Sequence, residues 1–527
     1  MTEDSASFPS LLDTPLKKWI PLSYENLLAT FILVLAVISR FYDLGARAMS
    51  HDEINHVVPT YNLYTGYGYT YDPMSHGPLQ FHLIGLSYAL FGDNDYTTRI
   101  PAALFGVATV AVGLLLFRRY LGRVGAIAAG LLLLISPYLL FYGRYARNEI
   151  FIVLWALLLL YSTLRYLERG ERWGLVLFVL TNALHFTDKA TSYMFAGGIF
   201  IFLFFYFIDQ AAHRSWTSST ERTRFLLGIA LFILLSTTIG VTYLLLKPET
   251  SNAPFPLAGI VLLVGLGILA GGMLVLATLS AVRGLGLISL HSLRSLDLLL
   301  LLGTLMLPMV AAIPLELLGL HPLDYSLPGL LRIFVTVLIL GGLGASLGLF
   351  WFGKRWLLYA AVFFLPILIL YTTFFTNPGM SGSGFVGAFA YWLEQHGEQR
   401  GSQPIFYYAL IQIPIYEFLP AIGTFLAALI AAFGRLWLSA PGQPFVPATS
   451  QEGQEQPVPT AALTVYWSAF SLAIFSYAGE RMPWLTCHIT LPMILATAWA
   501  IGWLVETAPE QLGRWRWRMA TRTLWLV

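Results

Sequence analysis

The sequence has few charged residues and almost no cysteine. Of its 527 residues, 11% are charged and 57% are hydrophobic, whereas a soluble chain carries about 25% charged residues. The single cysteine, Cys487, excludes an internal disulfide and any metal centre built from several cysteines. The net charge of +2 and the lack of a basic motif give no indication of nucleic-acid binding. This composition predicts an all-α polytopic membrane protein whose surroundings are a lipid bilayer.

The hydrophobic stretches are long enough to cross a bilayer many times. A membrane-spanning helix needs roughly 17–25 apolar residues, and several stretches must extend into their flanks to reach this length, so we expect about 14 spans. They are predicted at 27–42, 100–117, 124–142, 150–164, 173–185, 193–208, 225–246, 257–282, 296–315, 330–352, 356–375, 405–433, 461–477 and 485–505. The apolar stretch 79–91 is too short to span, so it is predicted to be an interfacial or re-entrant helix.

The positive charges indicate how the chain is oriented. Most lysines and arginines fall in every second connection between predicted spans. This predicts that these connections and both termini lie on the cytoplasmic side of the cell (plasma) membrane. The predicted parts are a cytoplasmic N-terminal segment (1–24), a first membrane module (25–210) with the first outer loop (43–99), further helices (211–438) with an outer loop (377–403), a flexible cytoplasmic linker (439–460), the last two spans (461–505) and a basic cytoplasmic tail (506–527). The glycine-rich start of 377–403 predicts a mobile loop that becomes ordered on substrate binding, with a surface helix at 391–396.

The first outer loop carries an unusual number of ionisable groups. Asp52 and Glu53 are adjacent and flanked by His51 and His56, and the motif His76-Gly77-Pro78-Leu79 follows. A carboxylate in this position can act as a general base toward a hydroxyl group. Asp52 and Glu53 could instead be a hydrated pair or a helix cap, and His76 could be a turn residue. The run 93–95, with its D-x-D pattern, is better read as turn and cap chemistry than as a metal site.

Other polar residues fall on the same predicted side. Ionisable groups at the ends of membrane spans are costly unless they are paired or face water, so they mark candidate sites. The candidates for binding a phosphate are Arg144, Arg147, Arg481 and His76, and those for lining a substrate cavity are His56, Glu149, Asp188, Lys189, Asp324, Glu417 and Glu480. Alternatively, the arginines pair with Glu149 and hold a loop, and Asp188 pairs locally with Lys189. Arginine binds phosphate bidentately, and a base opposite such cations suits group transfer from a lipid phosphate.

These motifs resemble a known group of enzymes. A first span, an outer loop with Asp52-Glu53, His76-Gly77-Pro78-Leu79 and a run ending in R-I-P-A-A-L-F-G at Gly106 resemble the GT-C superfamily of membrane glycosyltransferases. The protein O-mannosyltransferase and aminoarabinose-transferase type is most similar and has H-P-P-L where this chain has His76–Leu79. The downstream motifs N-P-G, Y-W-L-E-Q-H-G, Y-E-F-L-P and A-G-E-R-M-P-W resemble a prokaryotic subfamily associated by name with flippase-associated glycosylation. The W-W-D-Y-G signature of oligosaccharyltransferases is absent.

The resemblance implies a GT-C-like bundle with juxtamembrane helices in the first outer loop. It also implies a polyprenyl-phosphate-linked sugar donor, an acceptor hydroxyl on the outer face and inversion at the anomeric carbon. By motif, Asp52 matches the catalytic aspartate, Glu53 its acidic neighbour and 25–210 the catalytic module. Arg144 or Arg147 matches an arginine near the lipid phosphate. Gly77 replaces a proline, which predicts a freer loop there. The acceptor is unidentified, and a divalent metal held by Glu53 and His76 remains an open alternative.

Two other classes of function fit parts of the sequence. A lipid-linked-sugar flippase or other transporter would need a cavity that opens alternately, but the acidic residues gather on one predicted face. A non-catalytic subunit of a glycan-assembly complex would leave Asp52 inert. Consumption of a polyprenyl-phosphate sugar, and its loss on changing Asp52 to asparagine, would distinguish the enzyme from both.

Overall fold

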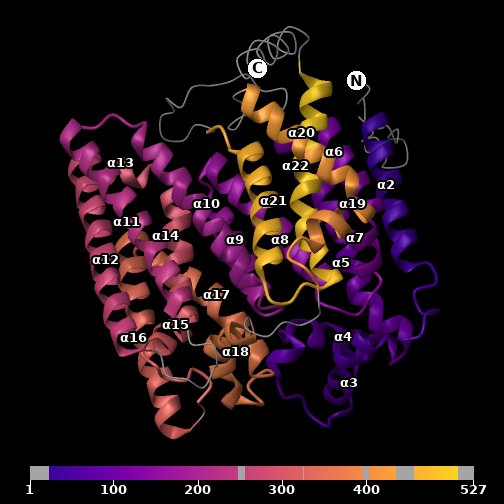
Figure 1. The fold of residues 1–527 in the computed structure, drawn as a ribbon. Helices are drawn as coiled ribbons and strands as arrows, with labels where there is room; N and C mark the ends of the chain where they lie inside the picture. Colours follow the sequence, from indigo (N-terminus) through magenta and orange to yellow (C-terminus); the bar gives the residue numbers. More distant parts are fainter. Residues whose placement is uncertain (1–22, 247–255, 325, 396–402, 435–455, 508–527) are drawn as a thin grey trace, which may run out of the picture.

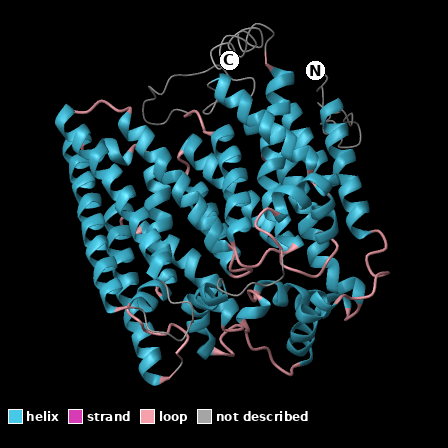
Figure 2. Ribbon diagram, in the orientation of Figure 1, coloured by secondary structure: helices cyan, strands magenta, loops and turns pink. Residues whose placement is uncertain are grey.

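The computed structural model describes residues 23–246, 256–324, 326–395, 403–434 and 456–507, and within these ranges every regular element is a helix (Figures 1 and 2). Most of the predicted N-terminal segment, of the basic tail and of the linker 439–460 lies outside the described residues, as does the last residue of the predicted surface helix 391–396. The α-helices of the first half are α2 (Tyr24–Phe41), α3 (His51–Thr65), α4 (Leu79–Phe91), α5 (Asp95–Leu115), α6 (Arg118–Ile135), α7 (Pro137–Tyr142), α8 (Glu149–Arg169), α9 (Arg172–Phe186), α10 (Ser192–Ala212) and α11 (Ser219–Leu246). Those that follow are α12 (Leu257–Leu285), α13 (Leu287–His291), α14 (Arg294–Met306), α15 (Ala312–Leu317), α16 (Leu327–Phe352), α17 (Arg355–Tyr371), α18 (Ala388–Gln395), α19 (Ile413–Tyr416), α20 (Phe418–Gly434), α21 (Thr460–Tyr477) and α22 (Thr486–Glu506).

The fold class predicted from the sequence is confirmed, but the count of about 14 spans is not. Nine helices in the described ranges are long and apolar enough to cross a membrane, or ten if the bent pair that joins Tyr408–Tyr416 to Phe418–Gly434 forms one span. Each of the other predicted stretches is also helical. These stretches do not form a single long apolar helix. Some are interrupted or have too few residues, as α17 has, and α6 contains several arginines.

The bundle is built around two buried helices. Most of α8 and α22 is enclosed by other helices, whereas few residues of α11 and α12, on the left of Figure 1, are buried. The helix α22 packs against α6, α8, α20 and α21. Residues at the lower ends of α8 and α22 in Figure 1 are therefore positioned by the helices packed around them.

Short helices cover the lower end of the bundle, opposite the start of α2 and the end of α22 (Figure 1). Ser50 begins α3 with a reciprocal cap, in which its hydroxyl accepts from the Glu53 amide and the Glu53 carboxylate accepts from the Ser50 amide. The helix ends at Gly66, whose φ of 85° suits glycine. The predicted interfacial helix over 79–91 is α4, and it packs on α3 and α5.

Two predictions about loops can be compared with the structure. The predicted surface helix at 391–396 corresponds to α18, and the glycine-rich stretch before it forms a short 3₁₀ helix (Pro378–Met380) and a π-helical turn (Ser383–Gly387). Asn94 accepts from the amides of Tyr96 and Thr97 and caps α5, as the cap interpretation of 93–95 predicted.

Candidate active site

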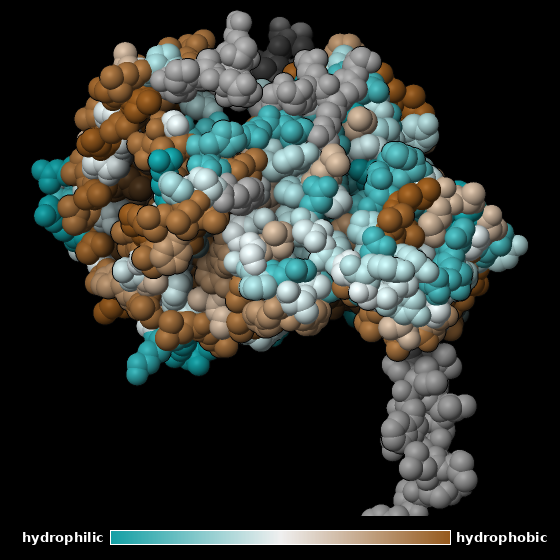
Figure 3. Space-filling view, turned by 90° about the horizontal axis from the view of Figure 1, so that it is seen from below, coloured by the Kyte–Doolittle hydropathy of each residue, from teal (hydrophilic) through white to brown (hydrophobic). Residues whose placement is uncertain are grey.

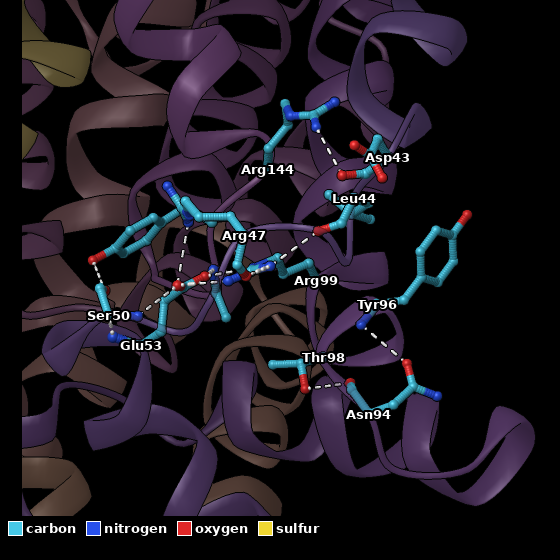
Figure 4. Close-up of polar contacts among 12 residues, drawn as sticks. Asp43, Leu44, Arg47, Ser50, Glu53, Asn94, Tyr96, Thr98, Arg99 and Arg144 are labelled. Atoms are coloured by element: carbon cyan, nitrogen blue, oxygen red, sulfur yellow. Dashed lines mark hydrogen bonds and ion pairs between the residues drawn. The ribbon is translucent and has the colours of Figure 1, made fainter.

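Glu53 makes the most polar contacts in the predicted first outer loop (43–99). Its fully buried carboxylate accepts from Arg99 Nε at 2.8 Å and Nη2 at 2.9 Å, from Arg47 at 3.2 Å, and from the Ser50 and Ala146 amides at 3.1 Å each (Figure 4). The third Arg99 nitrogen, Nη1, donates to the Leu44 and Arg47 carbonyls. Burial alone would raise the pKa of Glu53, but these donors outweigh it and hold the pKa below its ordinary value. Glu53 thus anchors α3 to α5.

Asp52 faces the opposite way and keeps access to water. Its side chain is 38% exposed, and its carboxylate accepts from Arg147 Nη1 at 2.8 Å. The Arg147 guanidinium is buried and lies 3.6 Å from the centre of the Trp484 ring, a cation–π contact. Trp484 precedes α22, so Arg147 connects the first outer loop with the end of the chain.

Behind Arg147 the charges continue inward. Arg147 Nε lies 3.1 Å from Glu149 Oε2, and Glu149 Oε1 accepts from Lys189 Nζ at 2.5 Å. All three side chains are buried. Opposite charges alternate from Asp52 to Lys189, so each buried charge has a partner, which such burial requires.

The motif His76–Leu79 docks on the turn after α9. The amide of Gly77 donates to the Asp188 carbonyl at 2.8 Å, and that of Leu79 to the Thr187 carbonyl at 2.9 Å. A Cβ on Gly77 would lie 2.3 Å from the Thr187 oxygen, so glycine is required by this close approach. The freer loop that Gly77 was expected to give is therefore not what the structure shows.

Asp188 supports this turn from within. Its carboxylate accepts from Asn148 Nδ2 at 2.7 Å and from Trp155 Nε1 at 3.2 Å, not from Lys189. Burial raises the pKa of Asp188 to about 8. The predicted local pair of Asp188 with Lys189 is thus replaced by contacts to α8 and to the residue just before it.

Two histidines stack beside Asp52. His56 lies one turn after Asp52 on α3, and its ring stacks on His76 at 6.3 Å between centroids; His76 stacks in turn on Trp392 of α18 at 5.4 Å. Burial, followed by the charge of Arg147, lowers the pKa of His56 to about 3. His76 has a φ of 70°, which is strained for a residue with a side chain. The stack joins α3, the motif and α18.

Several predicted site residues serve other contacts. Arg144 donates to the carbonyls of Ser39, Arg40 and Asp43 at the end of α2, and Arg481 donates to those of Ser476 and Gln403. These two arginines are occupied by main-chain oxygens. The structure therefore leaves Arg147 as the arginine in contact with Asp52.

Three other acids predicted to line the cavity interact with residues other than Asp52. Glu417 stands at the 111° bend between α19 and α20, where it accepts from the Ser136 hydroxyl at 2.6 Å and caps α7. Asp324 accepts from the Ser326 amide at the start of α16. The half-buried Glu480 acts electrostatically on Arg147. Glu417, predicted to line a substrate cavity, thus uses its carboxylate for capping at this bend.

Sequence reasoning missed Trp484, Asn148 and His488. Trp484 and His488 lie in the run P-W-L-T-C-H, whose apolar neighbours indicate only packing, and nothing local shows that Arg147 contacts Trp484. Within the described ranges no group of three or more His, Cys, Asp or Glu side chains is placed to hold a metal ion. Figure 3 shows the lower face, where hydrophilic residues gather across the centre and right and apolar residues dominate the left.

Together the fold and this ion cluster define a many-helix membrane protein with a charged site at one end of its bundle. A profile of the family described as dolichyl-phosphate-mannose-protein mannosyltransferase matches residues 75–239, which include the His76–Leu79 motif, Arg147, Glu149 and Lys189. This segment, less than half of the chain, is similar to that family, and the resemblance predicted from its motifs is confirmed there. None of the curated proteins matches the chain.

Solved structures give weaker likenesses. ArnT from Cupriavidus metallidurans bound to undecaprenyl phosphate is 14% identical, with 93% of this chain and 79% of that chain covered and a TM-score of 0.30. For AglB from Archaeoglobus fulgidus, in complex with an inhibitory peptide and a dolichol-phosphate, the identity is 14%, the coverage 96% and 60%, and the TM-score 0.33. The arabinosyltransferase EmbB from Mycobacterium smegmatis is 13% identical, with 94% and 42% covered and a TM-score of 0.26. These TM-scores are too low to carry a conclusion about this chain.

Proposed function

We propose that this chain is a membrane glycosyltransferase that moves a sugar from a polyprenyl-phosphate carrier to an acceptor hydroxyl. The reaction takes place at the α3 end of the bundle, on the outer face of the plasma membrane, and inverts the anomeric carbon. The matched family profile supports the reaction class. The donor class follows from the resemblance of the motifs in the first outer loop.

The observation that carries the proposal is the contrast between two adjacent carboxylates. Asp52 is 38% exposed and pairs with Arg147, whereas Glu53 is fully buried with five donors. A general base must reach the proton that it removes, so Asp52 meets this requirement and Glu53 does not. Arg147, held 2.8 Å from Asp52, is then next to the reacting atoms.

In the proposed step, the acceptor hydroxyl gives its proton to the Asp52 carboxylate as its oxygen attacks the anomeric carbon. The bond between that carbon and the phosphate oxygen breaks on the opposite face, so the configuration inverts. The electron pair leaves with the polyprenyl phosphate, and Arg147 stabilises its growing negative charge. Trp484 and Glu149 fix the guanidinium in place, which avoids reorganisation during the reaction.

The test is Asp52→Asn in the purified protein with a polyprenyl-phosphate sugar as donor. Loss of a general base costs roughly 10²–10⁴-fold in rate, so transfer should fall by that order while donor binding stays within about twofold. The matched control is Asp95→Asn, which alters an exposed carboxylate in the same loop. Unimpaired transfer by Asp52→Asn would refute Asp52 as the base.

A further inference from the structure

Two buried histidines lie deeper in the bundle than Arg147. His185 is near the end of α9 and His488 near the start of α22, and they are 1% and 0% exposed. Neither ring nitrogen of His488, nor Nε2 of His185, has a hydrogen-bond partner among the described residues. Burying a polar atom without a partner costs about 1–3 kcal/mol, so three such atoms together need an explanation.

The two histidines lie close to each other. Each packs against Phe195, with centroid distances of 4.8 Å for His185 and 5.7 Å for His488, and His488 also acts electrostatically on His185, which places them together. His488 follows Trp484 by four residues at the start of α22, so it lies about one turn further into the bundle than the ring beneath Arg147. The charges of Lys189 and Glu149 act on His488 directly.

The chemistry of this place restricts its occupant. An uncharged imidazole offers one donor and one acceptor, as a sugar hydroxyl group also does. A phosphate brings only acceptors, and among the described residues no group of three or more metal-ligating side chains is placed to hold a cation. The charge of Lys189 is already compensated by Glu149 at 2.5 Å. A ring with several hydroxyl groups therefore fits these atoms better than an anion or a metal.

We propose that His185 and His488 form the glycosyl-binding end of the site, where their ring nitrogens hydrogen-bond hydroxyl groups of the donor sugar. This rests on the proposed function, since the carrier phosphate at Arg147 is what brings the sugar to this depth. The acceptor approaches Asp52 from the exposed side, so the sugar occupies the inner side. The two histidines then determine which sugar is accepted.

The experiment measures binding of bare polyprenyl phosphate and of the same lipid carrying mannose, glucose or arabinose to the full chain in nanodiscs. The wild type should bind at least one glycosylated lipid about tenfold more tightly than the bare lipid. His488→Phe keeps a ring of similar size and removes both nitrogens. It should abolish that tenfold difference while leaving affinity for the bare lipid unchanged.

Thermal unfolding separates recognition from packing. Because His488→Phe removes unpartnered buried atoms, the melting temperature of the ligand-free protein should stay the same or rise. The control, His291→Phe, changes an exposed histidine that stacks on Trp351 and should alter neither lipid affinity.

Four outcomes would overturn the proposal. The first is equal wild-type affinity for bare and glycosylated lipids, and the second is a tenfold preference that survives in His488→Phe without a change in melting temperature. The third is survival of that preference with a lowered melting temperature, which would indicate that these nitrogens bind only buried water. The fourth is no binding of any lipid. The first three leave the proposed function standing if transfer is observed. The last would overturn the proposed function as well.

Discussion

At the residue scale, the central feature is that one arginine serves three partners. Arg147 contacts Asp52, Glu149 and the face of Trp484 through one planar group. Lysine has the same charge but lacks the flat, forked geometry needed for stacking and for bidentate phosphate binding. We therefore expect the identity of this side chain to affect binding of the proposed donor beyond its charge.

Arg147→Lys should weaken binding of polyprenyl phosphate by about tenfold or more, because one bidentate contact and the stacking on Trp484 are lost. Titration of the purified variant with the lipid measures this. Arg144→Lys is the control and should bind normally, since Arg144 donates only to main-chain carbonyls. Equal affinity of Arg147→Lys and the wild type would place the phosphate elsewhere.

Glu53→Gln should destabilise the protein by about 3–5 kcal/mol at pH 7, because it leaves the buried Arg99 without its counter-charge. The measurement is chemical or thermal unfolding in detergent. Glu25→Gln is the control, since the Glu25–Arg118 pair is partly exposed and such pairs contribute little. Similar stability losses in the two variants would contradict the anchoring role.

The same residue makes a pH prediction. The pKa of Glu53 in the fold lies below its ordinary value of 4.5, so its contribution is complete above pH 4.5 and is lost as pH falls toward the folded pKa. Between pH 7 and pH 4 the wild type should therefore lose more stability than Glu53→Gln, which lacks this carboxyl. Parallel melting curves at the two pH values test this, and an identical decrease in both proteins would count against it.

At the scale of elements, the docking of α4 depends on a backbone approach. Gly77→Ala should displace the His76–Leu79 motif, because the new Cβ would lie 2.3 Å from the Thr187 oxygen. We expect a melting temperature several degrees lower and at least a tenfold loss of transfer. Gly379→Ala is the control, since no heavy atom lies within 4 Å of its Cβ position. Wild-type behaviour of Gly77→Ala would show that the loop can move aside.

Local patterns predicted the elements well and the contacts poorly. The apolar stretch 79–91 coincides with α4, and Asn94 caps α5, because hydrophobic runs and caps are properties of neighbouring residues. Asp52 is partly exposed and Glu53 is buried because the two residues lie on different faces of α3. The partners of Arg144, Glu417 and Arg147 could not be predicted, because each depends on a segment distant in the sequence.

At the scale of the whole molecule, the proposal places α3 outside and the start of α9 inside. Glu149 and Arg169 are the two ends of α8, a buried helix of 21 residues, so the connection to α9 lies at the other end of the bundle from Arg147. Topology thus follows from where α8 begins and ends. The chain offers a direct way to measure it, because its single cysteine, Cys487, is fully buried.

An impermeant maleimide added to intact cells should label Tyr67→Cys, in the exposed turn after α3, and should not label Arg172→Cys until the membrane is opened. The unmodified chain, with only Cys487, gives the background. Labelling of both variants from one side would refute the topology. Labelling of Arg172→Cys alone would reverse it.

The contact between Arg147 and Trp484 also has a consequence for biogenesis. A ribosome makes Asp52 and Arg147 early and Trp484 among the last residues of the described chain, yet the guanidinium lies 3.6 Å from that ring. Chains emerge from the N-terminus and fold as they are made, so the site stays incomplete until α22 is inserted. Under the proposed function, an unfinished chain would therefore stay inactive throughout synthesis and could not consume donor lipid.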